Sequence, residues 1–441
     1  MHLTRSTTRR QFLQTGCRSI TSTVVGYWTC HSTSFAADEV RGDRLNVGVI
    51  GVGNRGVDNV NGVATENVYA LCDVDQRYLD EMHSRYPRAR VYRDFRELPD
   101  NKSMDAVVVC TPDHVHACAS IWALQRGLHV FCEKPMAHRL AQVRDMADVA
   151  TRADRKTQVG NQHATSLGYR RVAEIVQSGW LGKLESIHAW TDRPVWPQGD
   201  AVTRVGGEVP AYLDWDLWLG PANFHPYRDQ YHPFTWRAWW DFGSGALGDM
   251  GPHLLDPVLH AYDVTGQVSI GASSEGNSEA SCPRWSTLRF HLPLKGGESV
   301  GLHWYDGGRR PSADVLGTER PPSSGALLLG EHGRLFIPTL GKAPIAIANN
   351  KSWGPPPASR LQELPSIHQE WLAACKTGGD TCRSFGKSIT LTELCLAGCV
   401  AIRTEATEAS PLLWSAETGE LTGRPNIERY QRDQPRDGWG T

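Results

Sequence analysis

The sequence has no long apolar run. No stretch of its 441 residues approaches the roughly 18 consecutive apolar residues that mark a membrane-spanning helix, so we expect no membrane span. It also lacks a zinc-type spacing, because none of its 11 cysteines lies in a Cys-x-x-Cys pair or a Cys/His metal motif. Cys72, Cys110 and Cys132 each end an apolar run, which is typical of small buried side chains. We therefore expect reduced packing cysteines and no metal site.

An excess of positive charge is missing as well. The formal net charge is −2, and residues 1–36 contain four arginines and no acidic residue. Without this segment, 42 Lys and Arg residues stand against 48 Asp and Glu residues. A body of negative sign offers no electrostatic surface for nucleic acid, so we expect no nucleic-acid partner. The length and the ordinary composition predict a globular protein of two or three domains.

Residues 1–36 resemble a twin-arginine export signal. The motif "RRQFL" at 9–13 precedes a weakly apolar stretch, and Ser34 and Ala36 are placed like the small residues of a cleavage site. This pattern predicts export of the folded protein to the periplasm or another extracytoplasmic compartment. The alternative is a disordered basic tail on a protein that stays in the cytoplasm.

A glycine loop follows the first β-branched run of the body. Val47 to Ile50 lead into Gly51-x-Gly53-x-x-Gly56 and then into a helical pattern. In a dinucleotide-binding turn the first glycine makes the tight turn, the second lets a pyrophosphate approach the backbone, and the third lets the helix meet the strand. The phosphate then lies at the helix N-terminus. The loop therefore predicts a nucleotide site.

The acidic residue that ends the next strand bears on the choice of nucleotide. Asp73 follows the strand pattern "NVYALC", 22 residues after Gly51. An acid at this place can bind a ribose 2′-hydroxyl and would repel a 2′-phosphate, which favours NAD over NADP. Asp75 is an alternative for the same role, and either acid could instead be a solvated strand end.

Further strand patterns alternate with helical ones up to "KTQVGNQ" at 156–162. This rhythm predicts a doubly wound parallel sheet whose ligand lies beyond the carboxyl ends of the strands. The residues at these ends and in the glycine loop are therefore the predicted cofactor-binding residues. They are Gly51, Gly53, Asn54, Arg55, Gly56, Asp73, Thr111, Pro112, His116, Glu133, Lys134 and Asn161.

The second half of the chain is rich in tryptophan and then in strand patterns. Seven tryptophans lie between residues 190 and 240; their rings could line a carbohydrate site, or they could be packing residues. Trp236 and Arg237 are the candidate substrate residues. From about residue 268 the chain alternates as in a mostly antiparallel sheet with one open face. The segment 306–324 is predicted to be an exposed loop.

The motif "GSGALGDMGPHLLD" at 243–256 is the sharpest signal of this half. Asp249 and His253 are four residues apart near a predicted helix start, so their side chains lie on one face and can meet one ligand. His can act as a base near neutral pH, and Asp can orient it or hold a hydroxyl. Pro252 fits a first helical turn. The pair could be catalytic or structural.

On these residues the sequence resembles the Gfo/Idh/MocA family, named for glucose–fructose oxidoreductase and inositol dehydrogenase. The resemblance rests on the glycine loop, on "TPDHVH" at 111–116, on "EKP" at 133–135 and on the Asp-x-x-x-His motif, and it covers roughly residues 44–440. It implies that Lys134 hydrogen-bonds the reacting sugar hydroxyl beside the nicotinamide, opposite Asp249 and His253. It also implies that the open sheet packs against a second copy, giving a homodimer or homotetramer.

The predicted fold is α/β, with an N-terminal Rossmann sheet, doubly wound and parallel, and a C-terminal α+β domain with a large, mostly antiparallel, open-faced sheet. Four segments are expected, and they are the signal at 1–36, the NAD-binding domain at 44–162, the substrate and oligomerisation domain at 163–405 and a tail at 406–441 that packs back on the body.

The predicted function is NAD-dependent oxidation of a hydroxyl of a sugar, sugar derivative or polyol, with Lys134, Asp249 and His253 as catalytic residues. Export would separate the protein from free NAD, so a retained cofactor is expected. One alternative is a glycoside hydrolase or lyase that uses transient oxidation, like the NAD-dependent α-N-acetylgalactosaminidases; Lys134 argues against it. The other is a non-catalytic sugar-binding protein, against which the intact set of three residues argues.

Overall fold

The computed structural model describes residues 43–199, 206–318, 320–432 and 434–440. The export signal predicted for residues 1–36 lies outside them. Within the described part of the chain, no helix combines the length and the apolar character that crossing a membrane requires.

The first sheet is parallel and contains the predicted glycine loop. Its six strands lie in the order β3-β2-β1-β4-β5-β6, and every neighbouring pair is parallel. The doubly wound prediction is confirmed. The strands are β1 (Asn46–Ile50), β2 (Asn67–Cys72), β3 (Arg90–Tyr92), β4 (Ala106–Val109), β5 (His129–Glu133) and β6 (Thr157–Gly160).

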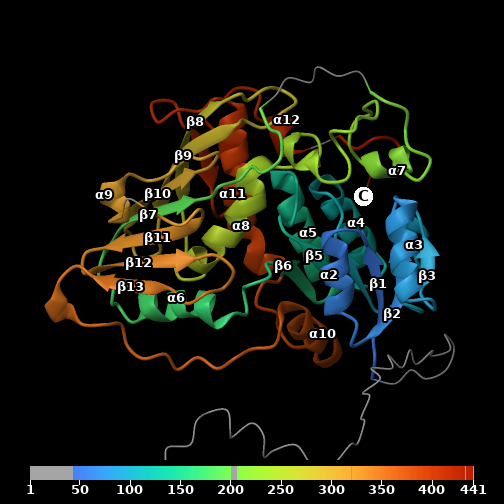
Figure 1. The fold of residues 1–441 in the computed structure, drawn as a ribbon, viewed down its shortest axis with the longest axis horizontal. Coiled ribbons are helices and arrows are strands. Elements are labelled where there is room, and N and C mark those ends of the chain that lie inside the picture. Colours follow the sequence, from blue (N-terminus) through green and yellow to red (C-terminus); the bar gives the residue numbers. More distant parts are fainter. Residues whose placement is uncertain (1–42, 200–205, 319, 433, 441) are drawn as a thin grey trace, which may run out of the picture. The chain divides into compact units, whose positions relative to one another are not determined.

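Helices alternate with these strands, as Figure 1 shows in blue and teal. The four that connect them are α2 (Arg55–Gly62), α3 (Gln76–Arg85), α4 (Asp113–Gln125) and α5 (Leu140–Ala153). Each of the central strands β1 and β4 is apolar and buried over nearly its whole length, as expected for a parallel sheet that is covered on both faces.

The second sheet has nine strands in the order β13-β12-β11-β7-β10-β9-β8-β14-β15. All its pairs are antiparallel except β7 with β10, which confirms the mostly antiparallel prediction. The strands are β7 (Leu184–Trp190), β8 (Gln267–Glu275), β9 (Trp285–Pro293), β10 (Ser299–Tyr305), β11 (Gly325–Gly330), β12 (Gly333–Pro338), β13 (Ile345–Ala348), β14 (Leu412–Ser415) and β15 (Leu421–Thr422). Central strand β7 precedes the region in which strands were predicted.

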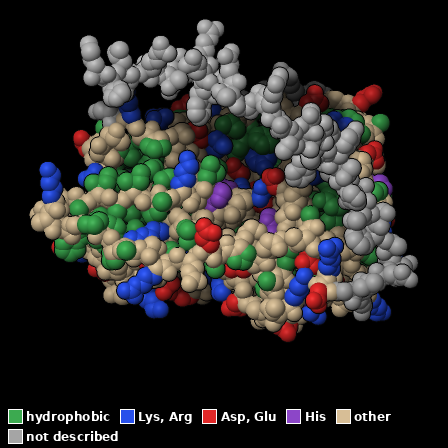
Figure 2. Space-filling view, turned by 60° about the horizontal axis from the view of Figure 1, so that its bottom comes forward, with side chains coloured by type: hydrophobic (Ala, Val, Ile, Leu, Met, Phe, Trp, Pro, Cys, Tyr) green, Lys and Arg blue, Asp and Glu red, His purple; other side chains and the backbone are tan. Residues whose placement is uncertain are grey.

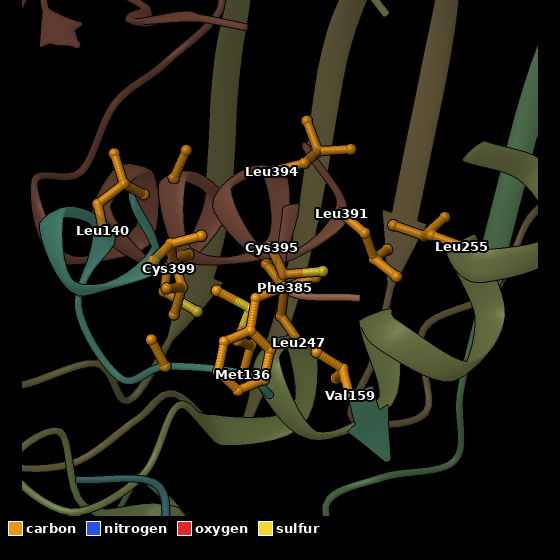
Figure 3. Packing of buried hydrophobic residues seen from close by; sticks show 14 of the residues in the cluster. Met136, Leu140, Val159, Leu247, Leu255, Phe385, Leu391, Leu394, Cys395 and Cys399 are labelled. Atoms are coloured by element: carbon orange, nitrogen blue, oxygen red, sulfur yellow. The ribbon is translucent and has the colours of Figure 1, made fainter. Parts of the chain in front are cut away.

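Helices cover one face of this sheet and connect it to the first (Figure 1). They are α6 (Leu167–Gln177), α8 (Gly245–Leu259) and α11 (Ile389–Arg403). Figure 3 shows side chains of α5, β6, α8 and α11 meeting in one cluster, with Cys395 and Cys399 inside it. Both thiols are buried and free, so these cysteines are packing residues. The shared core explains why residues Val40–Thr441 form one compact unit.

Helix α8 begins earlier than predicted. It starts at Gly245, so Pro252 lies in its interior and not in its first turn. A second proline, Pro257, also lies inside it. An interior proline removes a backbone hydrogen bond and costs roughly 3 kcal/mol. The helix forms nevertheless because most of its residues are buried against its neighbours, and tertiary packing supplies most helical stability.

Residues 206–243, which we name the aromatic strap, lie against the first sheet. They contain α7 (Trp215–Leu219) and the short helix η2 (Thr235–Ala238). The Asp214 amide donates to the Val74 carbonyl at 3.0 Å, and the Gln76 amide donates to the Tyr212 carbonyl at 2.8 Å. The strap therefore covers the chain just after β2.

The tryptophan cluster is mainly a packing feature. All seven tryptophans between residues 190 and 240 are at most 7% exposed, and five of them pack together in the strap's own apolar cluster. Rings so deeply buried cannot stack on a sugar in this conformation, so the packing alternative holds for them.

The remaining helices are α9 (Ala313–Leu316), α10 (Ile367–Thr377) and α12 (Glu428–Gln431). In α10, the side chains of Ile367, Trp371 and Leu372 pack on the first sheet. α9 interrupts the loop predicted for 306–324, in which Asp306 is buried.

Candidate active site

The glycine loop is a close-fitting cradle. Gly51 has a φ of +83°, and a Cβ there would lie 2.4 Å from the Cys110 carbonyl oxygen. A Cβ on Gly53 would lie 2.3 Å from the ring of Tyr78. Gly56 lies in the first turn of α2, directly against the Gly51 carbonyl. The loop therefore needs glycine at the positions that the fingerprint predicts.

The two acidic residues after β2 have different surroundings. Asp75 caps α3 and is fully buried in ion pairs with Arg77 and His232. Asp73 accepts hydrogen bonds from the amides of Val52 and Gly53 at 2.8 and 3.2 Å and is partly exposed. Burial raises the pKa of Asp73. Asp73 is therefore the acid that lies beside the glycine loop. The carboxylate of Asp75 is instead occupied by its contacts with Arg77 and with His232 of the strap.

The N-terminus of α2 is tied to the end of β5. The Asn54 side chain does not cap the helix. The Arg55 guanidinium donates to Glu133 Oε1 at 3.0 Å and to Asp58 at 2.8 Å. Glu133 also accepts from Asn59 at 3.0 Å. Glu133 is therefore a buried anchor that fixes the position of Arg55 at the rim of the site.

The loop between β4 and α4 is held in place by His116. Thr111 and Pro112 lie between β4 and α4 and are partly exposed. His116 is buried, and its two ring nitrogens lie 2.7 Å from the Pro135 carbonyl and 2.9 Å from the Thr111 carbonyl. Burial opposes a charged ring, but Cys132, Asp113 and the Pro135 carbonyl outweigh it and raise the pKa of His116 to about 9. His116 thus positions both strand-end loops and offers a ligand no free nitrogen.

Asn161 directly follows β6, and its carboxamide has no hydrogen-bond partner among the described residues. The residue is 2% exposed, and neither its Oδ1 nor its Nδ2 forms a hydrogen bond within the described part of the chain. A buried polar group of this kind costs free energy unless a ligand or water satisfies it. Together with the glycine cradle and Asp73, this orphaned amide fits a dinucleotide such as NAD.

Lys134 and Asp249 meet across the two domains. Lys134 directly follows β5, and its ammonium group donates to Asp249 Oδ1 at 2.8 Å and to the Asp249 backbone oxygen at 2.9 Å. Their side chains are 12% and 17% exposed. Burial opposes the charge of Asp249, but Lys134 and Arg237 outweigh it and lower the pKa of that carboxyl to about 2. The Asp249 carboxyl is therefore ionised at neutral pH.

His253 lies one helical turn beyond Asp249 on α8. Burial, and then the charge of Lys134, lower its pKa to about 3, so the imidazole is neutral at working pH. Within the described residues, neither of its ring nitrogens has a hydrogen-bond partner. A neutral imidazole with a free nitrogen can accept a proton from a ligand.

The structure adds His163, which the sequence analysis missed. It lies two residues after Asn161, and its charge acts on His253. Burial and the charge of Arg55 lower the pKa of His163, and its ring contacts Tyr169 edge-on, with centroids 6.0 Å apart. Its position just beyond the carboxyl end of β6 was the signal that could have identified it.

Arg237 and Trp236 form one side of the same site. Arg237 Nε lies 3.5 Å from Asp249 Oδ1, and its guanidinium carbon lies 4.2 Å from the centre of the Trp236 ring. Trp236 is buried, so it would meet a substrate through Arg237 and not by direct stacking. Figure 2 shows a hollow near the centre of one face, where basic, acidic and histidine side chains gather.

The described part of the chain contains no evident metal site. Within residues 43–199, 206–318, 320–432 and 434–440, no three His, Cys, Asp or Glu side chains are grouped so that they could hold a metal ion.

Two family models match the chain in tandem. The first, described as an oxidoreductase family with an NAD-binding Rossmann fold, matches residues 45–161, and the second, the C-terminal α/β domain of the same family, matches residues 170–298. Together they cover more than half of the chain. The first model assigns NAD binding to the domain that carries the glycine loop.

Named relatives match parts of the chain. Myo-inositol 2-dehydrogenase of Thermotoga maritima is 30% identical over 166 residues, which are 37% of this chain and 50% of that protein. D-glucoside 3-dehydrogenase of Escherichia coli is 28% identical over 235 residues, which are 52% of this chain and 57% of that protein. The chain thus spans about half the length of these curated relatives.

One solved structure illustrates the match in fold. An NAD-binding protein from Listeria innocua superposes with a TM-score of 0.55 at 16% identity, over 88% of this chain and 99% of that one.

Proposed function

The chain belongs to the Gfo/Idh/MocA oxidoreductase family, and we propose that it oxidises a hydroxyl group of a sugar, a sugar derivative or a polyol with NAD as its cofactor. The observation that carries this proposal is the contact of Lys134 with Asp249, 2.8 Å long, beside His253 and beyond the carboxyl end of β5. Ligands of doubly wound sheets bind at this edge.

In this proposal His253 is the base. Oxidation of a secondary alcohol removes a hydride from carbon and a proton from oxygen. A bound NAD supplies the acceptor for the hydride. His253 accepts the proton, because its ring is neutral and its ring nitrogens have no hydrogen-bond partner among the described residues. His163, on the other side of the site, is the second neutral ring that can bind a neighbouring hydroxyl.

Lys134 and Asp249 hold the reacting hydroxyl. The ammonium group has three N–H donors, and Asp249 occupies two of them in this structure. The third is free to donate to the substrate oxygen, which orients that oxygen towards His253. Positioned proton transfer of this kind contributes roughly 10²–10⁴-fold to a rate.

We also propose that residues 1–36 direct export and that the protein retains its cofactor. Outside the cytoplasm no free NAD pool restores a cofactor that has left, so a bound NAD would be restored within each catalytic cycle. The aromatic strap supports retention, because the Asp75–His232 contact of 2.9 Å attaches it to the first sheet beside the glycine loop.

A homodimer or homotetramer is the proposed assembly. The helices α8 and α11 cover only one face of the nine-stranded sheet (Figure 1). The edge strand β13 also exposes Ile345 and Ile347, each by about half. An apolar exposed edge of this kind favours contact with another chain. Light scattering of the purified protein, coupled to size exclusion, gives its mass; a monomer would contradict this part of the proposal.

The first experiment measures the nucleotide that the protein carries. Denaturing the purified full chain and identifying what it releases by mass spectrometry should give NAD or NADH in near-stoichiometric amount. The absence of released nucleotide, together with no binding of added NAD, would contradict the proposed cofactor.

The second experiment tests the site. Lys134→Met and His253→Ala should each lower the rate of sugar oxidation by about 10²-fold or more while NAD binding persists. Lys387→Met, a change at a half-exposed lysine that pairs with Asp380, is the matched control and should leave the rate unchanged. Product analysis of a glycoside substrate separates net oxidation from bond cleavage. Unchanged rates in both site variants would rule out this assignment.

A further inference from the structure

Arg237 is held rigidly at the edge of the candidate site. It lies on η2 with a side chain that is 22% exposed. Its guanidinium carbon lies 4.2 Å from the Trp236 ring centre and 4.6 Å from that of Phe234. Cation–π contacts of this kind fix the plane of the group. An immobile guanidinium loses little further entropy when it binds a ligand.

Most N–H donors of Arg237 have no hydrogen-bond partner among the described residues. Nε faces Asp249 Oδ1 at 3.5 Å, and Nη1 donates one hydrogen bond of 3.2 Å to the Phe234 carbonyl. A guanidinium has five N–H donors. Both donors of Nη2 and one of Nη1 therefore have no partner within the described residues. The 3.5 Å contact is also longer than an ordinary charged hydrogen bond, so Asp249 does not saturate the group.

The charges of this corner do not balance. Lys134 and Arg237 are both positive, and both contact the single carboxylate of Asp249. Arg55 is paired separately with two carboxylates, those of Glu133 and Asp58, and so contributes no unpaired positive charge. His163 and His253 are neutral. Within the corner formed by Lys134, Arg237 and Asp249, two positive groups therefore face one carboxylate, which leaves one positive charge of that corner unbalanced.

We infer that the substrate is an acidic sugar, such as a uronate or an aldonate, whose carboxylate binds the free edge of Arg237 while one of its hydroxyls lies between Lys134 and His253. This inference rests on the proposed function and names its substrate class. A planar carboxylate matches the fork of a guanidinium. Its single charge balances the single excess positive charge, whereas a phosphate monoester would bring about −1.5 to −2.

The test compares sugars that differ only in charge. Isothermal titration of the full-length protein, saturated with NADH, measures the affinities of D-glucuronate, D-galacturonate, the methyl ester of D-glucuronate, D-glucose and D-glucose 6-phosphate. At least one of the two uronates should bind about 10-fold or more tightly than its neutral counterpart. The ester should behave like the neutral sugar, since it keeps the hydroxyls and loses the charge.

Variants of Arg237 then locate the effect. Arg237→Gln should reduce the ratio of acid affinity to neutral affinity to about one, and Arg237→Lys should restore only part of it because the fork is lost. Lys295→Gln removes a surface charge that pairs with Asp263 and should leave the ratio unchanged.

Several results would overturn the inference. Equal binding of acids and neutral sugars, no binding of either acid, tighter binding of the phosphate, or an acid preference that survives in Arg237→Gln would each do so. These outcomes are separate from failure of the proposed function, which is read from NAD release and from the rate with Lys134→Met.

Discussion

At the scale of single residues, the candidate base differs strongly from an ordinary histidine in its pKa. His253 is neutral because it is buried next to Lys134, which lowers its pKa to about 3. The ordinary value for histidine is about 6.5. A base that remains neutral at moderately acid pH lets the reaction proceed where a solvent-exposed histidine would already be protonated.

A pH profile tests this difference. If His253 is the base, kcat/KM for sugar oxidation should stay nearly constant from pH 7 down to about pH 5, because the unprotonated ring persists to much lower pH. The measurement is kcat/KM of the free enzyme across this range in one buffer series. An acid limb with an apparent pKa near 6.5 would show that an unperturbed histidine carries the proton instead.

The sequence predicts several residues of this site but not all of their contacts. The place of Lys134 after a strand and of Asp249 near a helix start could be read from their motifs, whereas the expectation that they share a ligand rested on the family resemblance. The direct contact between Lys134 and Asp249 depends on how the two domains pack together, and so does the position of His163 near His253. No local pattern records that packing, and a single histidine after a strand has many ordinary explanations.

At the scale of elements, helix α8 carries both Asp249 and His253 and is anchored from outside the site. Arg383 donates to Asp256 Oδ1 at 2.6 Å and to Oδ2 at 3.1 Å, with both residues buried. The Arg383 carbonyl also accepts from the Val159 amide of β6 at 2.8 Å. Arg383 therefore joins helix α8 to β6 at the edge of the first sheet.

Removal of one partner should destabilise the whole protein. Arg383→Met leaves the Asp256 carboxylate buried without its partner, which costs about 3–5 kcal/mol. The matched control is Arg284→Met, since Arg284 pairs with Glu275 at the surface, where such pairs contribute about 0–1 kcal/mol. Urea denaturation gives both free energies of unfolding. Equal losses for the two variants would refute the anchoring role.

The elements themselves differ in how far the sequence predicts them. The parallel strands are short apolar runs that follow one another between helices, so their order and type could be read. The start of α8 could not be read, because glycine and proline are poor helix formers and only its burial against α11 compensates. The packing role of the aromatic strap could not be predicted either, since its aromatic residues are equally compatible with a sugar site and with packing.

At the scale of the whole molecule, buried histidines link stability to acid. Burial lowers the pKa of His114 and His253 to about 3 and of His129, His188 and His368 to about 4. These rings are neutral in the folded protein down to those values, whereas in the unfolded chain they take up protons below about pH 6.5. The free energy of unfolding should therefore fall as the pH drops below 6.5. Each such histidine contributes about 1.4 kcal/mol per pH unit.

Between pH 6.5 and 4.5, protonation of these buried histidines in the unfolded chain makes the largest contribution to the change in the free energy of unfolding. Asp249, whose pKa is lowered to about 2, contributes stability that is lost only below its unfolded value of about 3.9. His116, raised to about 9, has the opposite sign, because its contribution is fully present below pH 6.5 and is lost as the pH rises towards 9. Asp249 and His116 are thus silent within the window. Asp306, whose pKa burial raises to about 6, binds a proton more readily in the folded protein and so opposes one histidine there. The five neutral histidines outnumber it and dominate the slope.

Urea denaturation at several pH values measures that slope. Five histidines, opposed by Asp306, should together reduce the free energy of unfolding by about 5–6 kcal/mol per pH unit, a large fraction of the roughly 5–15 kcal/mol that stabilises a typical protein. His114→Asn, which removes one titrating ring, should reduce the slope by about 1.4 kcal/mol per pH unit. A free energy of unfolding that stays constant from pH 6.5 to 4.5 would mean that these rings are protonated in the folded protein. A protein that meets this expectation would be most stable near neutral pH, where its candidate base is also neutral.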